Sequence, residues 1–203
     1  MNDLVTDTGA AALGYGIGSI PIGLLIGRAR RGLDVRETGS GSMGSTNVMR
    51  VVGPAAGAAT FALDVGKGTA AVLAARALGA GTEGQVAAGL AAMVGHSWPV
   101  FAGFRGGKSV ATALGVLLPM SGEVSAWAVA GGLAGLASTR TMSVGSLTAA
   151  GVGTLGAGVS ALRGGPTAPL VFVGLASALV VVRHSDNIRR LVRGLEPRVR
   201  LTR

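Results

Sequence analysis

The sequence contains no cysteine among its 203 residues, and charged and aromatic residues are scarce, at 13% and 3%. The absence of cysteine excludes disulfide bonds and any metal site built on thiolates. A soluble domain usually carries about 25% charged residues, so the low charge argues against a soluble globular protein. What is abundant is apolar or small: apolar residues make up 49% of the chain, and 36 residues are glycine. Small residues let helices approach closely in a bilayer.

Long uncharged segments account for much of the chain. Residues 9–27 contain no charged side chain, and a membrane-spanning helix needs about 20 such residues. The residues before them carry Asp3 and Asp7 and lack the basic start of a cleavable signal peptide, so we expect this helix to be retained. Five more apolar segments follow, at 53–80, 84–102, 110–137, 144–162 and 166–182. The pattern predicts an all-α membrane protein in which residues 1–203 form a single polytopic domain.

The positive charge, formally +9, collects mainly in residues 28–50, 105–108 and 183–203. Nucleic-acid binding is the usual interpretation of so basic a chain, but apolar segments separate these three groups. Short basic loops stay in the cytoplasm, so we expect the C-terminus inside and the N-terminus outside. Six crossings would contradict this, and we expect residues 110–137 to break at 119–123, where Pro119, Gly122 and Glu123 favour a turn. The result is about seven transmembrane helices, some short or broken.

The first motif, at residues 39–50, reads GSGSMGSTNVMR and contains a literal G-x-G-x-x-G. A dinucleotide site would require a preceding strand, and an Arg-rich loop precedes this motif instead. Its glycines can bring backbone N–H groups close to a phosphate, while hydroxyl, amide and guanidinium groups add donors. The alternative is a flexible loop that binds nothing. The candidate residues are Gly39, Ser40, Gly41, Gly44, Thr46, Asn47 and Arg50.

The second motif, at residues 95–112, contains Gly106, Gly107 and Lys108 just before an apolar segment. It resembles the end of a P-loop, but the required first glycine is Ala102, so the match fails. What remains is a glycine turn with a lysine beside a helix start, which suits an anion. His96 is either a base or donor for chemistry or a structural hydrogen bonder.

The third motif, at residues 183–196, contains three candidate side chains: His184, Asn187 and Glu196. The alternative interpretation is a basic amphipathic tail that lies on anionic lipid. That interpretation explains the arginines but does not require these three residues.

Together these motifs resemble a known family. The patterns GSGxxGxTNxxR, GHxWPxFxGFxGGK and RHxDNIxRLxxGxE, in this order, are similar to the bacterial acyl-phosphate:glycerol-3-phosphate acyltransferases, the PlsY family. The similarity runs nearly end to end and includes residues 63–68 and, more weakly, the stretch at Ser143. The resemblance implies transfer of a fatty acyl group from acyl phosphate to the 1-hydroxyl of glycerol 3-phosphate. The products are 1-acylglycerol 3-phosphate (lysophosphatidic acid) and phosphate, the first acylation of phospholipid synthesis.

The resemblance also implies the site and its setting. The expected catalytic residues are Ser40, Arg50, His96, Lys108 and Asn187. The expected substrate-binding residues are Gly39, Gly41, Gly44, Thr46, Asn47, Lys67, Gly106, Gly107, Ser143, His184 and Glu196. We expect no metal and no cofactor, with the two phosphorylated substrates and membrane lipid as partners and no nucleic acid. The expected location is the bacterial cell membrane, multi-pass, with the active site toward the cytoplasmic face.

Two residues depart from the family pattern. Ser42 stands where the family usually has Asn, and Ser109 where it usually has Gly. The base is either His96 or a substrate phosphate. The His-x4-Asp motif of acyl-CoA-dependent acyltransferases is missing after His96. A transporter or channel for a phosphorylated anion and a catalytically dead scaffold are the competing functions.

Overall fold

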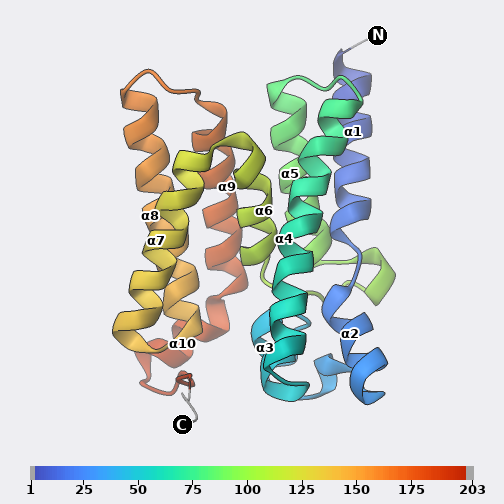
Figure 1. Cartoon of the computed structure of the whole chain (residues 1–203), viewed down its shortest axis with the longest axis vertical. Helices are drawn as coiled ribbons and strands as arrows, with labels where there is room; N and C mark the ends of the chain where they lie inside the picture. The colour runs from blue at the N-terminus through green and yellow to red at the C-terminus, as the bar shows by residue number, and fades with distance from the viewer. Residues whose placement is uncertain (1–2, 200–203) are drawn as a thin grey trace. The chain divides into compact units, whose positions relative to one another are not determined.

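A computed structural model describes residues 3–199, and every regular element among them is a helix (Figure 1). The chain divides into two compact units, with the boundary between Pro119 and Met120. Each unit is described by itself below. The helical content confirms the all-α fold class expected from the apolar segments.

The first unit holds six α-helices and two short 3-10 turns. They are α1 (Asp3–Gly18), α2 (Ile22–Arg31), η1 (Val35–Glu37), α3 (Ser45–Val51), α4 (Pro54–Ala77), α5 (Thr82–Ser97), η2 (Val100–Ala102) and α6 (Val110–Met120). Helices α1, α4 and α5 pack side by side (Figure 1). The loops after α2 and after α5 carry the first two sequence motifs, so this unit holds both glycine-rich segments.

Glycine sets the distance between α1 and α5. A Cβ atom added to Gly14 or Gly18 of α1 would overlap the backbone of Ala88 or Ala92 of α5. Such backbone contact is the way small residues join helices where the surrounding lipid is as apolar as the side chains. Much of the glycine in this helix pair is therefore explained by packing rather than by turns.

The sequence predicts one continuous helix over residues 9–27, but the structure interrupts it. Helix α1 ends at Gly18, and α2 begins only at Ile22, after Pro21 with φ −88° and ψ 68°. Proline lacks the N–H that would continue the helical ladder, and its ring displaces the preceding turn. The expectation missed this break because apolarity alone does not report where the ladder is interrupted.

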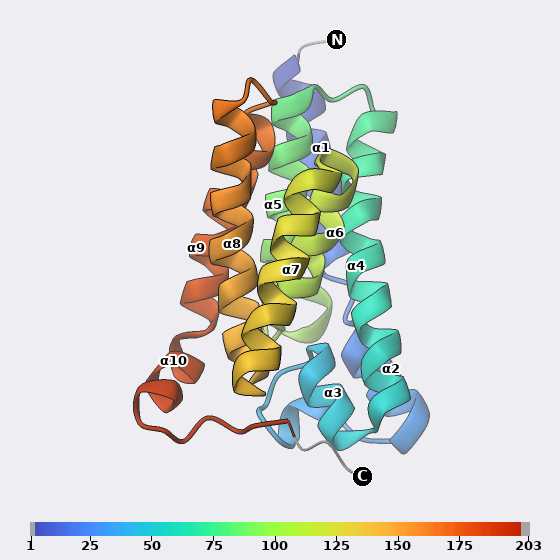
Figure 2. The same cartoon turned by 60° about the vertical axis from the view of Figure 1, so that its left-hand side comes forward.

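The second unit contains α7 (Gly122–Thr139), α8 (Met142–Leu162), α9 (Ala168–Arg183) and α10 (Ser185–Val192). Figure 2 shows α7 and α8 running side by side, with the short α10 at an angle to α9. The turn expected at residues 119–123 is confirmed: Ser121 leaves the helical conformation, and its Oγ accepts a hydrogen bond from Val124 N.

Three stretches among the described residues are long and apolar enough to cross a membrane: Asp3–Arg31, Pro54–Ala77 and Met142–Leu162. A fourth is possible if α9 and α10, bent by 62°, count as one span. Leucines such as Leu63 of α4 and Leu155 of α8 are exposed on these helices, which suits contact with lipid. The number of seven crossings and the orientation of the termini stay predictions.

Candidate active site

The first glycine motif is organised by one buried side chain, Asn47 near the start of α3. Its Nδ2 donates to the carbonyl oxygens of Val35 at 2.7 Å, Ser42 at 2.8 Å and Thr38 at 3.2 Å. Its Oδ1 accepts from the backbone N–H of Ser40 at 2.8 Å. A buried amide with all these bonds holds the loop in one conformation. The structure thus gives Asn47 a role in shaping the loop, and its predicted role in substrate binding stays a prediction.

Glycine is required at two positions of this loop. Gly39 and Gly41 have φ of +63° and +69°, a region that side chains rarely adopt. A Cβ at Gly39 would also overlap Oδ1 of Asn47. Ser40, between them, is exposed, as is Arg50 in the last turn of α3. The loop therefore presents a hydroxyl on a rigid backbone, while Gly44 and Thr46 lie half-buried at the start of α3.

An ion pair fastens this loop to the second motif. Arg36 donates through Nε to Asp34 Oδ1 at 2.9 Å and through Nη2 to Asp34 Oδ2 at 2.7 Å. Its Nη1 donates to the carbonyl oxygen of Ala102 in the loop after α5. Hydrogen bonding to Arg36 lowers the pKa of Asp34 to about 2, against the opposing effect of burial. From the sequence, Arg36 counted only as one of the basic residues that set the membrane orientation. The acidic residue two positions before it was the one sequence feature that could have indicated this ion pair.

Three ionisable side chains meet in the buried centre of the unit. Lys67 Nζ lies 2.8 Å from Asp64 Oδ1 and 2.7 Å from His96 Nδ1, and His96 Nδ1 lies 3.5 Å from Asp64 Oδ1. All three are at most 5% exposed. A buried charge needs a partner, and the neighbouring turns of α4 and α5 supply it. Sequence reasoning selected Lys67 and His96 but gave Asp64 no role in the site.

The second glycine motif wraps around His96. The backbone N–H of Gly107 donates to the His96 carbonyl oxygen at 3.0 Å, and a Cβ on Gly107 would overlap the imidazole at Nε2. A Cβ on Gly106 would likewise overlap the carbonyl oxygen of His96. Lys108 follows, half-buried, two residues before α6 begins. Backbone donors and the dipole at a helix start favour an anion, and Lys108 adds a positive charge there.

In the second unit, Glu196 gathers most of the predicted residues of the third motif. It accepts from Ser143 Oγ at 2.8 Å, from Asn187 Nδ2 at 2.5 Å and from Arg190 Nε at 2.7 Å. Burial alone would raise the pKa of Glu196, but these hydrogen bonds outweigh it, and the pKa is lowered. Ser143, Asn187 and Glu196 lie in one cluster, and Arg190 joins them without having been predicted.

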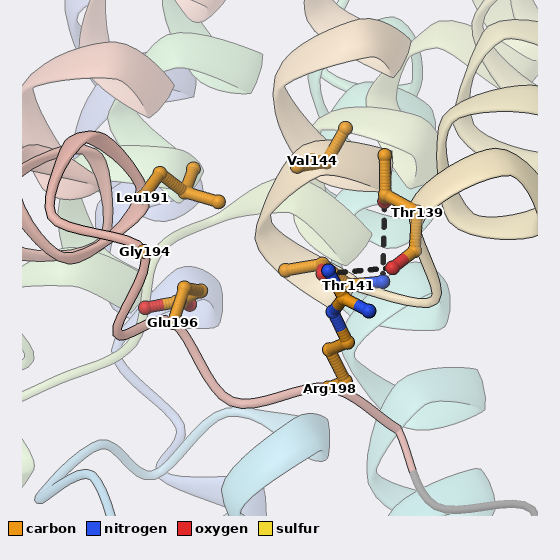
Figure 3. A pocket seen from close by; sticks show the side chains of 7 residues that line it. All are labelled: Thr139, Thr141, Val144, Leu191, Gly194, Glu196 and Arg198. Carbon is orange, nitrogen blue, oxygen red and sulfur yellow. Dashed lines mark hydrogen bonds between the residues drawn. The ribbon is translucent and has the colours of Figure 1, made fainter.

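A small pocket opens beside this cluster (Figure 3). It is lined by Thr139, Thr141, Val144, Leu191, Gly194, Glu196 and Arg198. The tail closes it from one side, because Val199 N donates to the carbonyl oxygen of Arg140 in the α7–α8 turn at 2.7 Å. His184, the remaining predicted residue of this motif, is buried, and its Nδ1 lies 2.8 Å from the carbonyl oxygen of Val180.

Comparison with known proteins identifies the family. The sequence matches the family described as Glycerol-3-phosphate acyltransferase over residues 8–194. A glycerol-3-phosphate acyltransferase of Anaeromyxobacter sp. (strain Fw109-5) is 48% identical to this chain. The alignment covers 99% of this chain and 100% of that relative. One from Synechococcus sp. (strain CC9902) is 44% identical, over 93% of this chain and 92% of the relative. The chain belongs to the glycerol-3-phosphate acyltransferase family.

Crystal structures agree with this assignment. The chain is similar to PlsY, an integral membrane glycerol 3-phosphate acyltransferase, in its glycerol 3-phosphate form, with 36% identity, 96% coverage of both chains and a TM-score of 0.87. The lysophosphatidic acid form gives 35% identity, 96% and 95% coverage and a TM-score of 0.85. The resemblance carried by the three motifs is thereby confirmed, as is an integral membrane fold. Membership in the acyltransferase family displaces the transporter or channel that we had kept as the alternative.

Several of the predicted site residues fall into three contact networks. Asn47 links Ser40 and Gly39, His96 links Lys67 and Gly107, and Glu196 links Ser143 and Asn187. Among residues 3–199 no group of three His, Asp or Glu side chains is placed to hold a metal ion. The catalytic and substrate-binding roles of the individual residues stay proposals.

Ser109, where the family usually has glycine, has the backbone conformation that glycine favours. Its φ is +60°, and its hydroxyl donates to the carbonyl oxygen of Met93 at 2.6 Å and pairs with Ser97 Oγ at 2.7 Å. The other departure, Ser42, accepts a hydrogen bond from Gly44 N at 3.2 Å. Both serines are therefore integrated into the loops of the first unit.

Proposed function

We propose that this acyltransferase moves a fatty acyl group from acyl phosphate to the 1-hydroxyl of glycerol 3-phosphate. The observation that carries the acceptor is the similarity, over 96% of the chain, to a PlsY structure in its glycerol 3-phosphate form. The product follows from the related lysophosphatidic acid form. The reaction would be the first acylation of phospholipid synthesis.

Two anion-binding loops in the first unit support two phosphorylated substrates. One presents Ser40 and is followed by Arg50, and the other presents Lys108 at the start of α6. Arginine offers a planar fork for phosphate, and a helix start offers backbone donors. The apolar surfaces of the helices suit the acyl chain.

In the proposed step, the 1-hydroxyl oxygen attacks the acyl carbonyl carbon, and the bond from that carbon to the phosphate oxygen breaks. The hydroxyl proton passes to a phosphate oxygen, so lysophosphatidic acid and inorganic phosphate leave. Because the donor is a mixed anhydride with a good leaving group, no covalent enzyme intermediate is required. Positioning and neutralisation of charge by Arg50 and Lys108 provide the acceleration.

Glu196 contributes differently to this proposal. Its carboxylate is buried and saturated by Ser143, Asn187 and Arg190. A carboxylate so occupied orients Asn187 and Ser143 rather than accepting a substrate proton. We place the reaction at the cytoplasmic face of the cell membrane, because the basic loops carry the motifs.

The test is an assay of the purified protein in detergent micelles with labelled glycerol 3-phosphate. Palmitoyl phosphate should give labelled lysophosphatidic acid together with an equal amount of phosphate. Palmitoyl-CoA, matched in chain length, should give none. Comparable turnover with palmitoyl-CoA would overturn the donor assignment, and no turnover with either donor would overturn the enzymatic function.

A further inference from the structure

Helix α10 has two faces of different character. Asn187 is buried and Arg190 is half-buried, whereas Arg189, Val192 and Arg193 are exposed. Residues three or four positions apart share one side of a helix. The exposed residues therefore lie together on the side opposite Asn187 and Arg190, and we call Arg189, Val192 and Arg193 the outer face. The sequence allowed two interpretations of this motif, site residues or a basic segment on lipid, and each interpretation describes one face.

The inner face of α10 is joined to α8 through Glu196. Asn187 Nδ2 donates to Glu196 Oε1 at 2.5 Å, and Arg190 Nε donates to Oε2 at 2.7 Å. Glu196 also accepts from Ser143 Oγ, in the first turn of α8, at 2.8 Å. The position of Asn187, one of the predicted catalytic residues, therefore depends on where α10 lies.

The chain reaches α10 at an abrupt change from apolar to basic sequence. Val181 and Val182 near the end of α9 are exposed apolar residues, and Arg183 follows them. Helix α10 is bent by 62° from α9 (Figure 2). Its eight residues extend only about 12 Å at about 1.5 Å per residue, too short to cross a bilayer. With α9 as the crossing that the sequence predicts, α10 runs along the membrane surface.

The outer face combines apolar side chains with arginines. Val192 is 84% exposed, and Leu195, just after the helix, is 67% exposed. Arg189 and Arg193 lie beside them. Apolar side chains next to long cationic ones are typical of a segment at the headgroup level, where the apolar groups enter the acyl boundary and the cations stay at the phosphates.

The charge of this segment favours an anionic surface. Residues 183–199 contain five arginines and two carboxylates. Glu196 belongs to the inner cluster, while Asp186 is exposed, with Oδ1 3.6 Å from Arg189 Nη1. An ion pair exposed to water is weak, so a lipid phosphate can replace this carboxylate as the partner of Arg189. Charge complementarity thus selects negatively charged headgroups.

We propose that the outer face of α10 binds anionic phospholipid headgroups, and that this contact holds the Glu196 cluster in its active arrangement. The second part rests on the proposed function, because it concerns acyl transfer. Lipid binding to one face restrains the helix, and the opposite face then keeps Asn187 against Glu196. The enzyme consequently responds to the negative charge of the membrane in which it works.

A fluorescent probe tests the lipid contact without any substrate. The chain has no cysteine, so Val192→Cys gives the full-length protein one site for an environment-sensitive dye. The protein is placed in nanodiscs of phosphatidylcholine, with or without about 30% phosphatidylglycerol of the same acyl chains. Emission should become brighter and shift to the blue with phosphatidylglycerol. Leu175→Cys, exposed in the middle of α9, is the control and should give equal emission in both lipids.

Removing the charge should remove the response. Arg189→Gln with Arg193→Gln should make the Val192→Cys probe insensitive to phosphatidylglycerol, and about 0.5 M salt should weaken the wild-type response by screening. Arg163→Gln, which neutralises an exposed arginine at the end of α8, should leave it intact. A probe that emits equally in both lipids would overturn the proposal, whether it is shielded in both or exposed in both.

Activity in the same nanodiscs tests the coupling to the site. With saturating palmitoyl phosphate and glycerol 3-phosphate, kcat should be at least about threefold higher with phosphatidylglycerol. Saturation matters because the anionic lipid also repels the anionic substrates, which affects KM. The double arginine variant should keep the kcat measured in phosphatidylcholine and lose the increase, whereas Arg163→Gln should keep the increase.

The two measurements separate the possible failures. A probe response with equal kcat in both lipids would overturn the coupling to the Glu196 cluster. The same result would follow from an increase in kcat that persists in the double arginine variant. A probe response without acyl transfer in either lipid would mean that the proposed function fails, while the binding of α10 to anionic lipid stands.

Discussion

The hydroxyl of Ser109 donates to the carbonyl oxygen of Met93, 2.6 Å away, while the Ser109 backbone is left-handed with φ of +60°. One serine therefore both fastens the turn to α5 and holds a conformation that glycine adopts more easily. The two contributions have opposite signs. A left-handed residue with a side chain costs about 1–2 kcal/mol, and leaving a buried polar partner unsatisfied costs about 1–3 kcal/mol.

Substitutions at Ser109 should separate these contributions. Ser109→Ala loses the hydrogen bonds and keeps the strain, so we predict a clear fall in thermal stability. Ser109→Gly loses the same bonds but relieves the strain, and it should be more stable than Ser109→Ala by about 1–2 kcal/mol. Thermal unfolding in one detergent measures both. An alanine variant as stable as the glycine variant would refute the strain argument.

Asn47 should be essential because it forms four hydrogen bonds to the loop backbone. We predict that Asn47→Ala lowers kcat/KM by at least about 100-fold, or about 2.7 kcal/mol at about 1.36 kcal/mol per decade. Asn47→Asp should not rescue it, because a carboxylate would face three carbonyl oxygens. Thr38→Ala keeps the backbone carbonyl that Asn47 uses and is the control, with activity near wild type. Normal kinetics in Asn47→Ala would show that the loop needs no such anchor.

Arg50 and Lys108 are predicted to bind substrate phosphate at the membrane edge. Arg50→Ala and Lys108→Ala should each lower kcat/KM by at least about 100-fold. Arg50→Lys should also be damaging, because the planar fork is lost. Arg163→Ala, an exposed arginine at the end of α8, should leave kinetics unchanged. Near wild-type activity with normal expression in both alanine variants would contradict the phosphate site. It would indicate that these cations contact only lipid headgroups.

The Asp34–Arg36 pair should make stability depend on acidity. The pKa of Asp34 is lowered from 3.8 to about 2 by hydrogen bonding to Arg36, so the folded state binds its proton later than the unfolded state. The stabilisation is therefore full above pH 3.8 and is lost as the pH falls toward about 2. We predict that the difference in Tm between wild type and Asp34→Asn shrinks across this interval.

A double-mutant cycle provides the control for this prediction. In an Arg36→Gln background, Asp34→Asn should have a smaller effect on Tm, and one that no longer varies over the same interval. An effect of equal size with and without Arg36 would mean that the ion pair does not cause the acid sensitivity.

Topology can be tested without background, because the chain has no cysteine. Single cysteines at Arg31 and Arg193, both exposed, should be shielded from an impermeant maleimide in right-side-out vesicles and labelled in inside-out vesicles. A cysteine at Leu162, 91% exposed, should show the reverse. Labelling of all three from the same side would contradict the orientation deduced from the basic loops.

The sequence by itself determined the features that depend on local composition. Apolar length placed most of the helices, and the turn at residues 119–123 followed from proline, glycine and an acidic residue that must meet water. The order of three polar motifs indicated the family. The break at Pro21 was not predicted, because the uncharged segment 9–27 was treated as one helix although it contains this proline.

Tertiary structure alone decided which polar groups meet. Lys67 and His96 are 29 residues apart, and Ser143 and Glu196 are 53 apart, so no spacing rule joins them. Such contacts depend on how the packed segments approach one another. Glycine permits one such approach, between α1 and α5 in the first unit. Hydrogen-bond roles depend on those distances in turn. Asn47 shapes its loop, and Glu196 holds Ser143 and Asn187, because donors and acceptors acquire definite partners only when the chain has packed.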